Sequence, residues 1–112
     1  MNFKFNAISV EEIEKAKGVP IENCVTDTTI STLALFIQKA VVDDDGKVGT
    51  SRSVAMTMID EYLKNHEKQD LTLDIMEALV DAGFLSKELN VNQMREALTN
   101  YTKQVSKQLD NI

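Results

Sequence analysis

Apolar residues recur every three or four positions over most of the chain, which is the spacing that places them on one face of an α-helix. Polar and glycine-containing stretches separate these runs and set the expected ends of the helices. The run from Ile30 to Val41 is the most hydrophobic, so we expect its helix at the centre of the fold. The pattern predicts five helices, at residues 9–17, 28–42, 52–65, 71–82 and 91–109.

Residues that favour helix ends lie at these boundaries. Ser9 followed by Glu12 has the spacing of a capping box, in which each side chain binds a free amide of the first turn. Gly83 predicts the end of the fourth helix, because a left-handed glycine lets the next apolar residues pack back onto the last turn. The expected N-caps of the first four helices are Ser9, Asp27, Ser51 or Ser53, and Asp70 or Thr72.

The first seven residues have a different period. Phe3, Phe5 and Ala7 alternate with polar residues, which is typical of a short, half-buried strand. An isolated strand leaves N–H and C=O groups unpaired, so this one requires a partner. Residues 24–26 are the nearby candidate within the chain, and a second subunit or another protein is the alternative.

These patterns predict a mainly α fold: a single-domain helical bundle of about five helices with a short N-terminal strand. A chain of 112 residues has the length of one domain, 1–112. We distinguish an acidic helical body, residues 1–88, from a C-terminal amphipathic helix, residues 89–112. The inward stripe of the third helix is expected to consist of Val54, Ala55, Met58, Ile59, Tyr62 and Leu63. The residues expected to be buried are Leu33, Ile37, Ile59, Leu63, Ile75 and Leu79.

The charge balance narrows the range of partners. Twelve Lys and Arg against eighteen Asp and Glu give a net charge of −6, whereas nucleic-acid backbones select for positive proteins. The chain shows neither the apolar stretch of a signal peptide nor the run of about 20 apolar residues that spans a membrane. Its single cysteine, Cys24, cannot form an internal disulfide. We therefore expect a cytoplasmic protein with no nucleic-acid or membrane partner.

Candidate residues for chemistry are sparse. The acidic loop 43–45 precedes a glycine at the sixth place of a calcium-binding pattern, but Val41 and Arg52 stand at the first and twelfth places, where acids are required. His66 is the only histidine, so a zinc site lacks a second imidazole. Cys24 has no glycine-rich turn to present it, and we interpret it as a buried structural thiol. We expect no enzyme activity, no cofactor and no metal.

The C-terminal segment carries a narrow apolar stripe whose members are separated by three, four, three and four residues. This is the heptad spacing of a helix seam, and it is narrower than the face that usually folds onto a core. We interpret it as a contact surface for a partner protein or a second copy of the chain. Two heptads are fewer than a coiled coil needs, so the pattern leaves the oligomeric state open. The stripe consists of Val91, Met94, Leu98, Tyr101 and Val105.

Several segments together are similar to a known protein family. They are the Phe-Lys-Phe start, the central hydrophobic helix followed by an acidic loop, and the segments 58–63 (MIDEYL), 73–79 (LDIMEAL) and 82–85 (AGFL). In this order they resemble the small tail assembly chaperones of long-tailed phages and prophages of Gram-positive bacteria. The resemblance covers residues 1–88. It implies an acidic, helical, non-enzymatic protein that keeps the tape measure protein soluble while tail tube subunits polymerise around it.

Two other functions remain as hypotheses. A small regulatory protein of a mobile element would also be acidic and helical, and it would bind a cellular protein through the same stripe. A DNA-binding regulator is disfavoured by the net charge and by the lack of a basic recognition helix.

Overall fold

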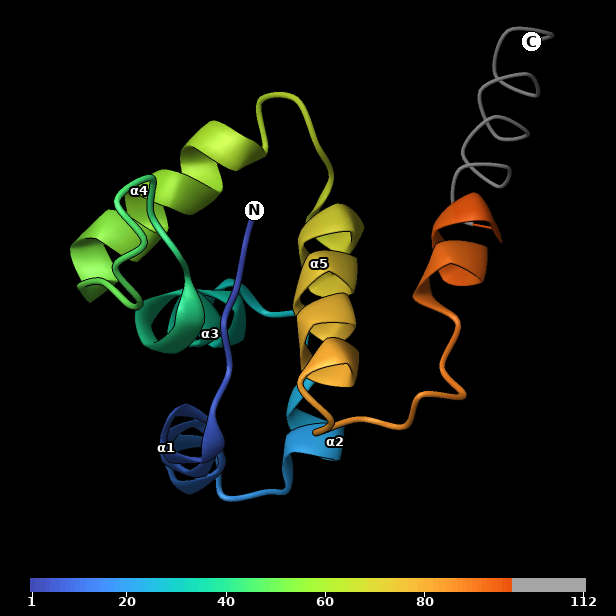
Figure 1. Ribbon diagram of the computed structural model, residues 1–112. Helices are drawn as coiled ribbons and strands as arrows, with labels where there is room; N and C mark the ends of the chain where they lie inside the picture. Colours follow the sequence, from blue (N-terminus) through green and yellow to red (C-terminus); the bar gives the residue numbers. More distant parts are fainter. Residues whose placement is uncertain (98–112) are drawn as a thin grey trace, which may run out of the picture.

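The computed structural model describes residues 1–97 and confirms a mainly α fold (Figure 1). A further helical segment, residues 91–97, follows the last labelled helix. No helix among the described residues is both long enough and apolar enough to cross a membrane. The labelled helices are α1 (Ala7–Lys17), α2 (Ile21–Cys24), α3 (Ile30–Ala40), α4 (Arg52–Tyr62) and α5 (Lys68–Asp81).

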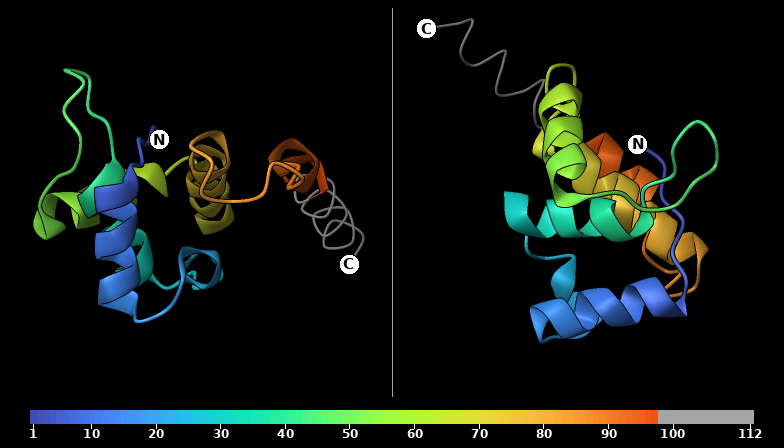
Figure 2. Two further views of the ribbon diagram at one scale, coloured as in Figure 1. Left: turned by 60° about the horizontal axis from the view of Figure 1, so that its bottom comes forward. Right: turned by 90° about the vertical axis from the view of Figure 1, so that its left-hand side faces the viewer.

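Helix α3 lies at the centre of the fold, as its sequence predicts. It packs against α1, α4 and α5, which surround it in both views of Figure 2. Its side chains Phe36 and Ile37 are at most 1% exposed, and Phe5 packs edge-on against Phe36 with ring centroids 6.0 Å apart. The other fully buried members of this core include Ile13, Leu33, Leu71, Ile75 and Leu79.

The N-terminal arm, residues 1–5, pairs within the chain, but not with the predicted segment 24–26. Phe3 forms an antiparallel bridge with Val41, because the Lys4 amide donates to the Ala40 carbonyl (2.8 Å) and the Val42 amide donates to Asn2 (2.9 Å). Val42 in turn forms an antiparallel bridge with Val48. The prediction of helix at 41–42 is therefore wrong, since α3 ends at Ala40 and the chain continues as extended backbone.

The observed N-cap residue differs from the predicted one at three of the four helices for which an N-cap was predicted. Asn6 caps α1 and forms its capping box with Ser9, which lies inside the helix. Thr29 caps α3, because the Asp27 carboxylate is engaged with the Thr29 amide and with Lys17. Glu67 precedes α5, which begins three residues earlier than predicted. The third predicted N-cap, Ser51, is confirmed.

The junction between α1 and α3 contains a short helix that the sequence pattern did not predict. Helix α2 is only four residues long, too short for a periodic stripe, and its Cys24 is buried. Lys17 fastens the junction, donating to Asp27 (2.5 Å) and to Thr32 (2.8 Å). Gly18, at φ +73°, ends α1 in the left-handed conformation that the turn requires.

Five of the six residues predicted to be buried are buried. The exception is Leu63, which is half-buried because α4 ends at Tyr62 and Leu63 falls at its C-cap. The predicted end of α5 at Gly83 is confirmed, with the Phe84 and Leu85 amides donating to the carbonyl of Leu79. Leu85 is thereby buried against the core, at 7% exposure.

Candidate functional site

The outer side of α4 carries an apolar groove of about 570 Å³. Ser51 caps the helix, and Val54 and Met58, four residues apart, form the apolar wall. Ala55 and Ile59 of the same helix point into the core instead and are at most 2% exposed. The α4 groove, as we name it, is lined by Met1, Ser53, Val54, Thr57, Met58, Glu61 and Tyr62.

The groove is open rather than covered by the described part of the chain. Val54 is 47% exposed and Met58 is half-buried, although the apolar pattern predicted both on the inward stripe. The prediction for Val54 is wrong, whereas Ala55 and Ile59, which were predicted on the same stripe, face the core. No local signal separates Val54 from Ala55, because both are apolar and both lie in the first turn of α4.

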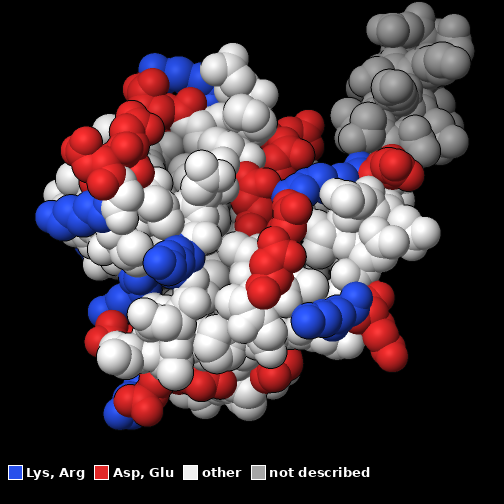
Figure 3. Space-filling view, in the orientation of Figure 1, with Lys and Arg blue, Asp and Glu red and all other residues white. Residues whose placement is uncertain are grey.

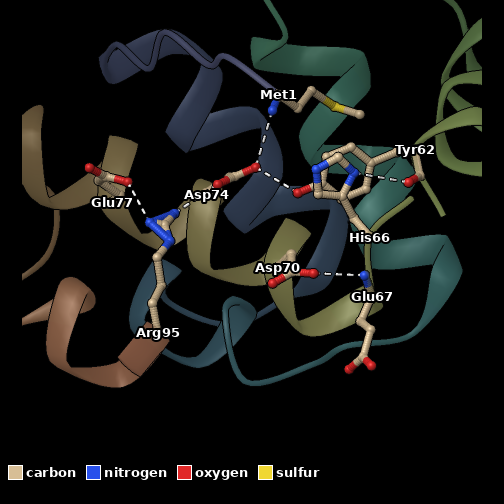
Figure 4. A network of polar contacts seen from close by, with 8 residues as sticks. All are labelled: Met1, Tyr62, His66, Glu67, Asp70, Asp74, Glu77 and Arg95. Carbon is tan, nitrogen blue, oxygen red and sulfur yellow. Dashed lines mark hydrogen bonds and ion pairs between the residues drawn. The ribbon is translucent and has the colours of Figure 1, made fainter. Parts of the chain in front are cut away.

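A network of polar contacts around Asp74 adjoins the α4 groove through Met1 and Tyr62, which belong to both (Figure 4). The Asp74 Oδ2 atom accepts from the Tyr62 hydroxyl (2.9 Å) and pairs with the terminal ammonium of Met1 (3.1 Å). Its Oδ1 atom accepts from Arg95 Nη2 (2.7 Å), while Arg95 Nη1 donates to Glu77 (2.9 Å). The Asp74 network therefore joins the N-terminal arm, α4, α5 and segment 91–97.

Tyr62, the aromatic residue that bonds to Asp74, acts as a hydrogen-bond donor in this network. Burial, and then its hydrogen bond to the Asp74 carboxylate, raise the pKa of the Tyr62 hydroxyl above its ordinary range. The hydroxyl therefore stays protonated at neutral pH and keeps donating. On its other side the ring stacks on the ring of His66, with centroids 4.2 Å apart and an angle of 10° between the planes. His66 Nδ1 also lies 3.2 Å from the Tyr62 carbonyl, so the only histidine belongs to the end of α4.

The described members of the predicted C-terminal stripe differ in their exposure to solvent. Val91 is 6% exposed and Met94 is 36% exposed, so the first is buried and the second lies at the surface. Leu98, Tyr101 and Val105 lie outside the described residues. Arg95, which the stripe does not include, is the residue that fastens segment 91–97 to α5. Its role depends on carboxylates about 20 residues away in the sequence, and no local pattern indicates it.

Cys24 and the acidic loop, which the sequence offered as candidates for chemistry, have structural roles. Cys24 is fully buried, and burial raises the pKa of its thiol, which keeps it protonated and unreactive. In the acidic loop, the Asp43 carboxylate accepts from the amides of Asp45 and Lys47, which holds the turn. Across residues 1–97, no three His, Cys, Asp or Glu side chains are grouped so that they could hold a metal ion.

Charge is distributed unevenly on the face shown in Figure 3. Acidic side chains gather over α4 and over α5, and uncharged surface lies between these two regions. The α4 groove has one acidic residue, Glu61, which is paired with Lys64 (2.9 Å). No protein-family model, curated protein or solved structure matches this chain.

Proposed function

We propose that this protein is a non-enzymatic binding protein that keeps a long, aggregation-prone helical partner soluble, as a tail assembly chaperone does for the tape measure protein. The observation that carries the proposal is the open α4 groove. Apolar side chains of a partner helix would gain free energy by leaving water there, at about 25 cal/mol per Å² of apolar surface buried. Met58 in its wall adapts to different partner side chains, because the thioether chain is unbranched and flexible.

The charge of the chain supports the same proposal. A net charge of −6 makes complexes repel one another, which opposes their aggregation while the partner is held. The groove is short, and a short apolar contact gives the moderate affinity that a releasable chaperone requires. The C-terminal stripe remains a second predicted contact, with Met94 as its exposed member among the described residues. A regulatory protein of a mobile element is the alternative, since it would use the same groove.

A pair of matched substitutions tests the groove. Val54 is 47% exposed inside the groove. Val48 is 42% exposed and lies outside the groove, in the hairpin that residues 41–49 form between α3 and α4. Val54→Asp places a charge where the partner helix would bury apolar surface, so we expect binding to weaken at least about tenfold. The fold should tolerate this change, because position 54 is in the first helical turn, where an acid is favourable.

The chaperone proposal predicts that a long helical protein is encoded immediately downstream of this chain, and the measurement is co-purification with that protein at low salt. Val48→Asp is the control and should co-purify as the unmodified protein does. Equal co-purification of both variants would refute the role of the groove. If the unmodified protein and both variants all failed to co-purify with the partner, the chaperone proposal would be refuted and the regulatory alternative favoured.

A further inference from the structure

The outer edge of the N-terminal arm has unpaired main-chain groups. Residues 48–49, 41–42 and 2–4 form an antiparallel ladder of three short segments. The Asn2 carbonyl and the Lys4 amide point toward residues 40–42, and alternate residues of an extended segment direct these groups to opposite sides. The N–H and C=O of Phe3 therefore point away from the ladder, and neither has a hydrogen-bond partner among residues 1–97.

This free edge faces a cleft. In Figure 1 the arm runs alongside α5, and the hairpin that pairs with the arm lies on the arm's other side. A cleft of about 590 Å³ lies between the arm and α5. Its walls are residues 1–5 on one side and Asp74, Glu77, Ala78, Asp81 and Ala82 on the other. We call it the arm–α5 cleft.

The helical wall of the cleft has two carboxylates that can accept from a ligand. Asp74 is occupied by its three donors, but Glu77 uses only Oε2 to bind Arg95 and its side chain is 47% exposed. Asp81, four residues further along α5, is exposed and has no ion-pair partner within the described range. Ala78 and Ala82 are small and leave room between these acids and the arm.

We propose that the arm–α5 cleft binds an extended peptide segment of a partner, which adds as a fourth strand to the arm and directs a Lys or Arg side chain to Glu77 and Asp81. A free strand edge selects an extended backbone, because only such a backbone offers N–H and C=O groups in register with Phe3. The acids on α5 select a basic side chain in that segment. A partner helix satisfies its own backbone groups and leaves Phe3 unpaired.

This binding mode is independent of the proposed chaperone function. The two surfaces share only Met1 in their linings, and the α4 groove would hold a helix whereas the cleft would hold a strand. Loss of one kind of binding can therefore be measured without loss of the other.

The test is a titration of the full chain with short peptides, followed by the backbone amide signals in NMR spectra. The basic probe is an acetylated and amidated peptide of alternating valine and lysine. We expect it to shift the Phe3 amide and the amides of α5 around Ala78, and to protect the Phe3 amide from hydrogen exchange. A valine–glutamate peptide should not bind. The valine–lysine peptide methylated at every backbone nitrogen should bind at least about tenfold more weakly, because it cannot donate to the Phe3 carbonyl.

Variants locate the site. Asp81→Asn should weaken the basic peptide about two- to fivefold, the range expected for one exposed ion pair. Asp44→Asn, an equal change at the exposed tip of the acidic loop, should leave it unchanged. Equal binding of the methylated and unmethylated peptides would overturn the proposal by showing that charge alone attracts the probe. The proposal would also be overturned if Asp81→Asn and Asp44→Asn weakened binding equally, or if the basic peptide did not bind at about 1 mM.

Discussion

Removing the charge of Asp74 should loosen four parts of the fold at once. Asp74→Asn keeps the shape of the side chain but weakens its contacts with Tyr62, Met1 and Arg95. The Tyr62 hydrogen bond goes to a charged carboxylate and contributes about 1.5–3 kcal/mol. Each of the two ion pairs is partly exposed and contributes about 0.2–1 kcal/mol. Because Asn keeps one acceptor oxygen, we expect the free energy of unfolding to fall by about 1.5–3 kcal/mol.

Urea unfolding followed by far-ultraviolet circular dichroism measures this change, through the midpoint and slope of the transition. Asp60→Asn, on the exposed side of α4, is the control and should change the free energy of unfolding by less than about 0.5 kcal/mol. Hydrogen exchange at residues 91–97 should quicken in Asp74→Asn, because Arg95 loses one of its two carboxylates. Equal stability of the two variants would refute the stabilising role of the Asp74 network.

Three further changes test other parts of the structure. Gly49→Ala should lower the free energy of unfolding more than Gly46→Ala does. Both glycines have a positive φ, which costs a substituted residue about 1–2 kcal/mol. Only at Gly49 would the new Cβ also lie 2.9 Å from a backbone oxygen, that of Gln38. Urea midpoints of the two variants compare them. Several hydrogen bonds, the strongest from Lys17, hold the pKa of Asp27 well below its ordinary value of 3.8. The stability that this carboxylate contributes is therefore present above pH 3.8 and is lost as the pH falls below it. Asp27→Asn should therefore be less stable than the unmodified protein at pH 7, and the difference should shrink below about pH 4 in acid titrations of stability. Ile37→Ala should lower the free energy of unfolding by about 2–5 kcal/mol, because Ile37 is fully buried at the centre of α3.

The long helices were predictable because their stripes are long enough to show a period. The repeated apolar positions of α3 identified both the helix and its central place. Helix α2 has four residues, fewer than the stripe that reveals a helix, and it was missed. The partner of the arm was also missed, because the pairing of Phe3 with Val41 depends on how α3 folds back, and no local pattern encodes it.

The candidate surfaces were less predictable than the fold. Binary patterning marks Val54 as apolar, but whether such a residue enters the core or an open groove depends on the neighbouring elements. The Asp74 network joins residues as far apart as Met1 and Arg95. Charged residues on helix faces are usually solvated, so their spacing alone does not show which of them meet.

The soluble yield of the partner tests the central claim most directly. The long helical partner that the proposal predicts would be expressed alone, with this protein, and with its Val54→Asp variant. The proposal predicts that the unmodified protein raises the soluble fraction of the partner several-fold and co-purifies with it, whereas Val54→Asp does neither. The same soluble fraction of the partner with and without this protein would contradict the proposal that it acts as a chaperone.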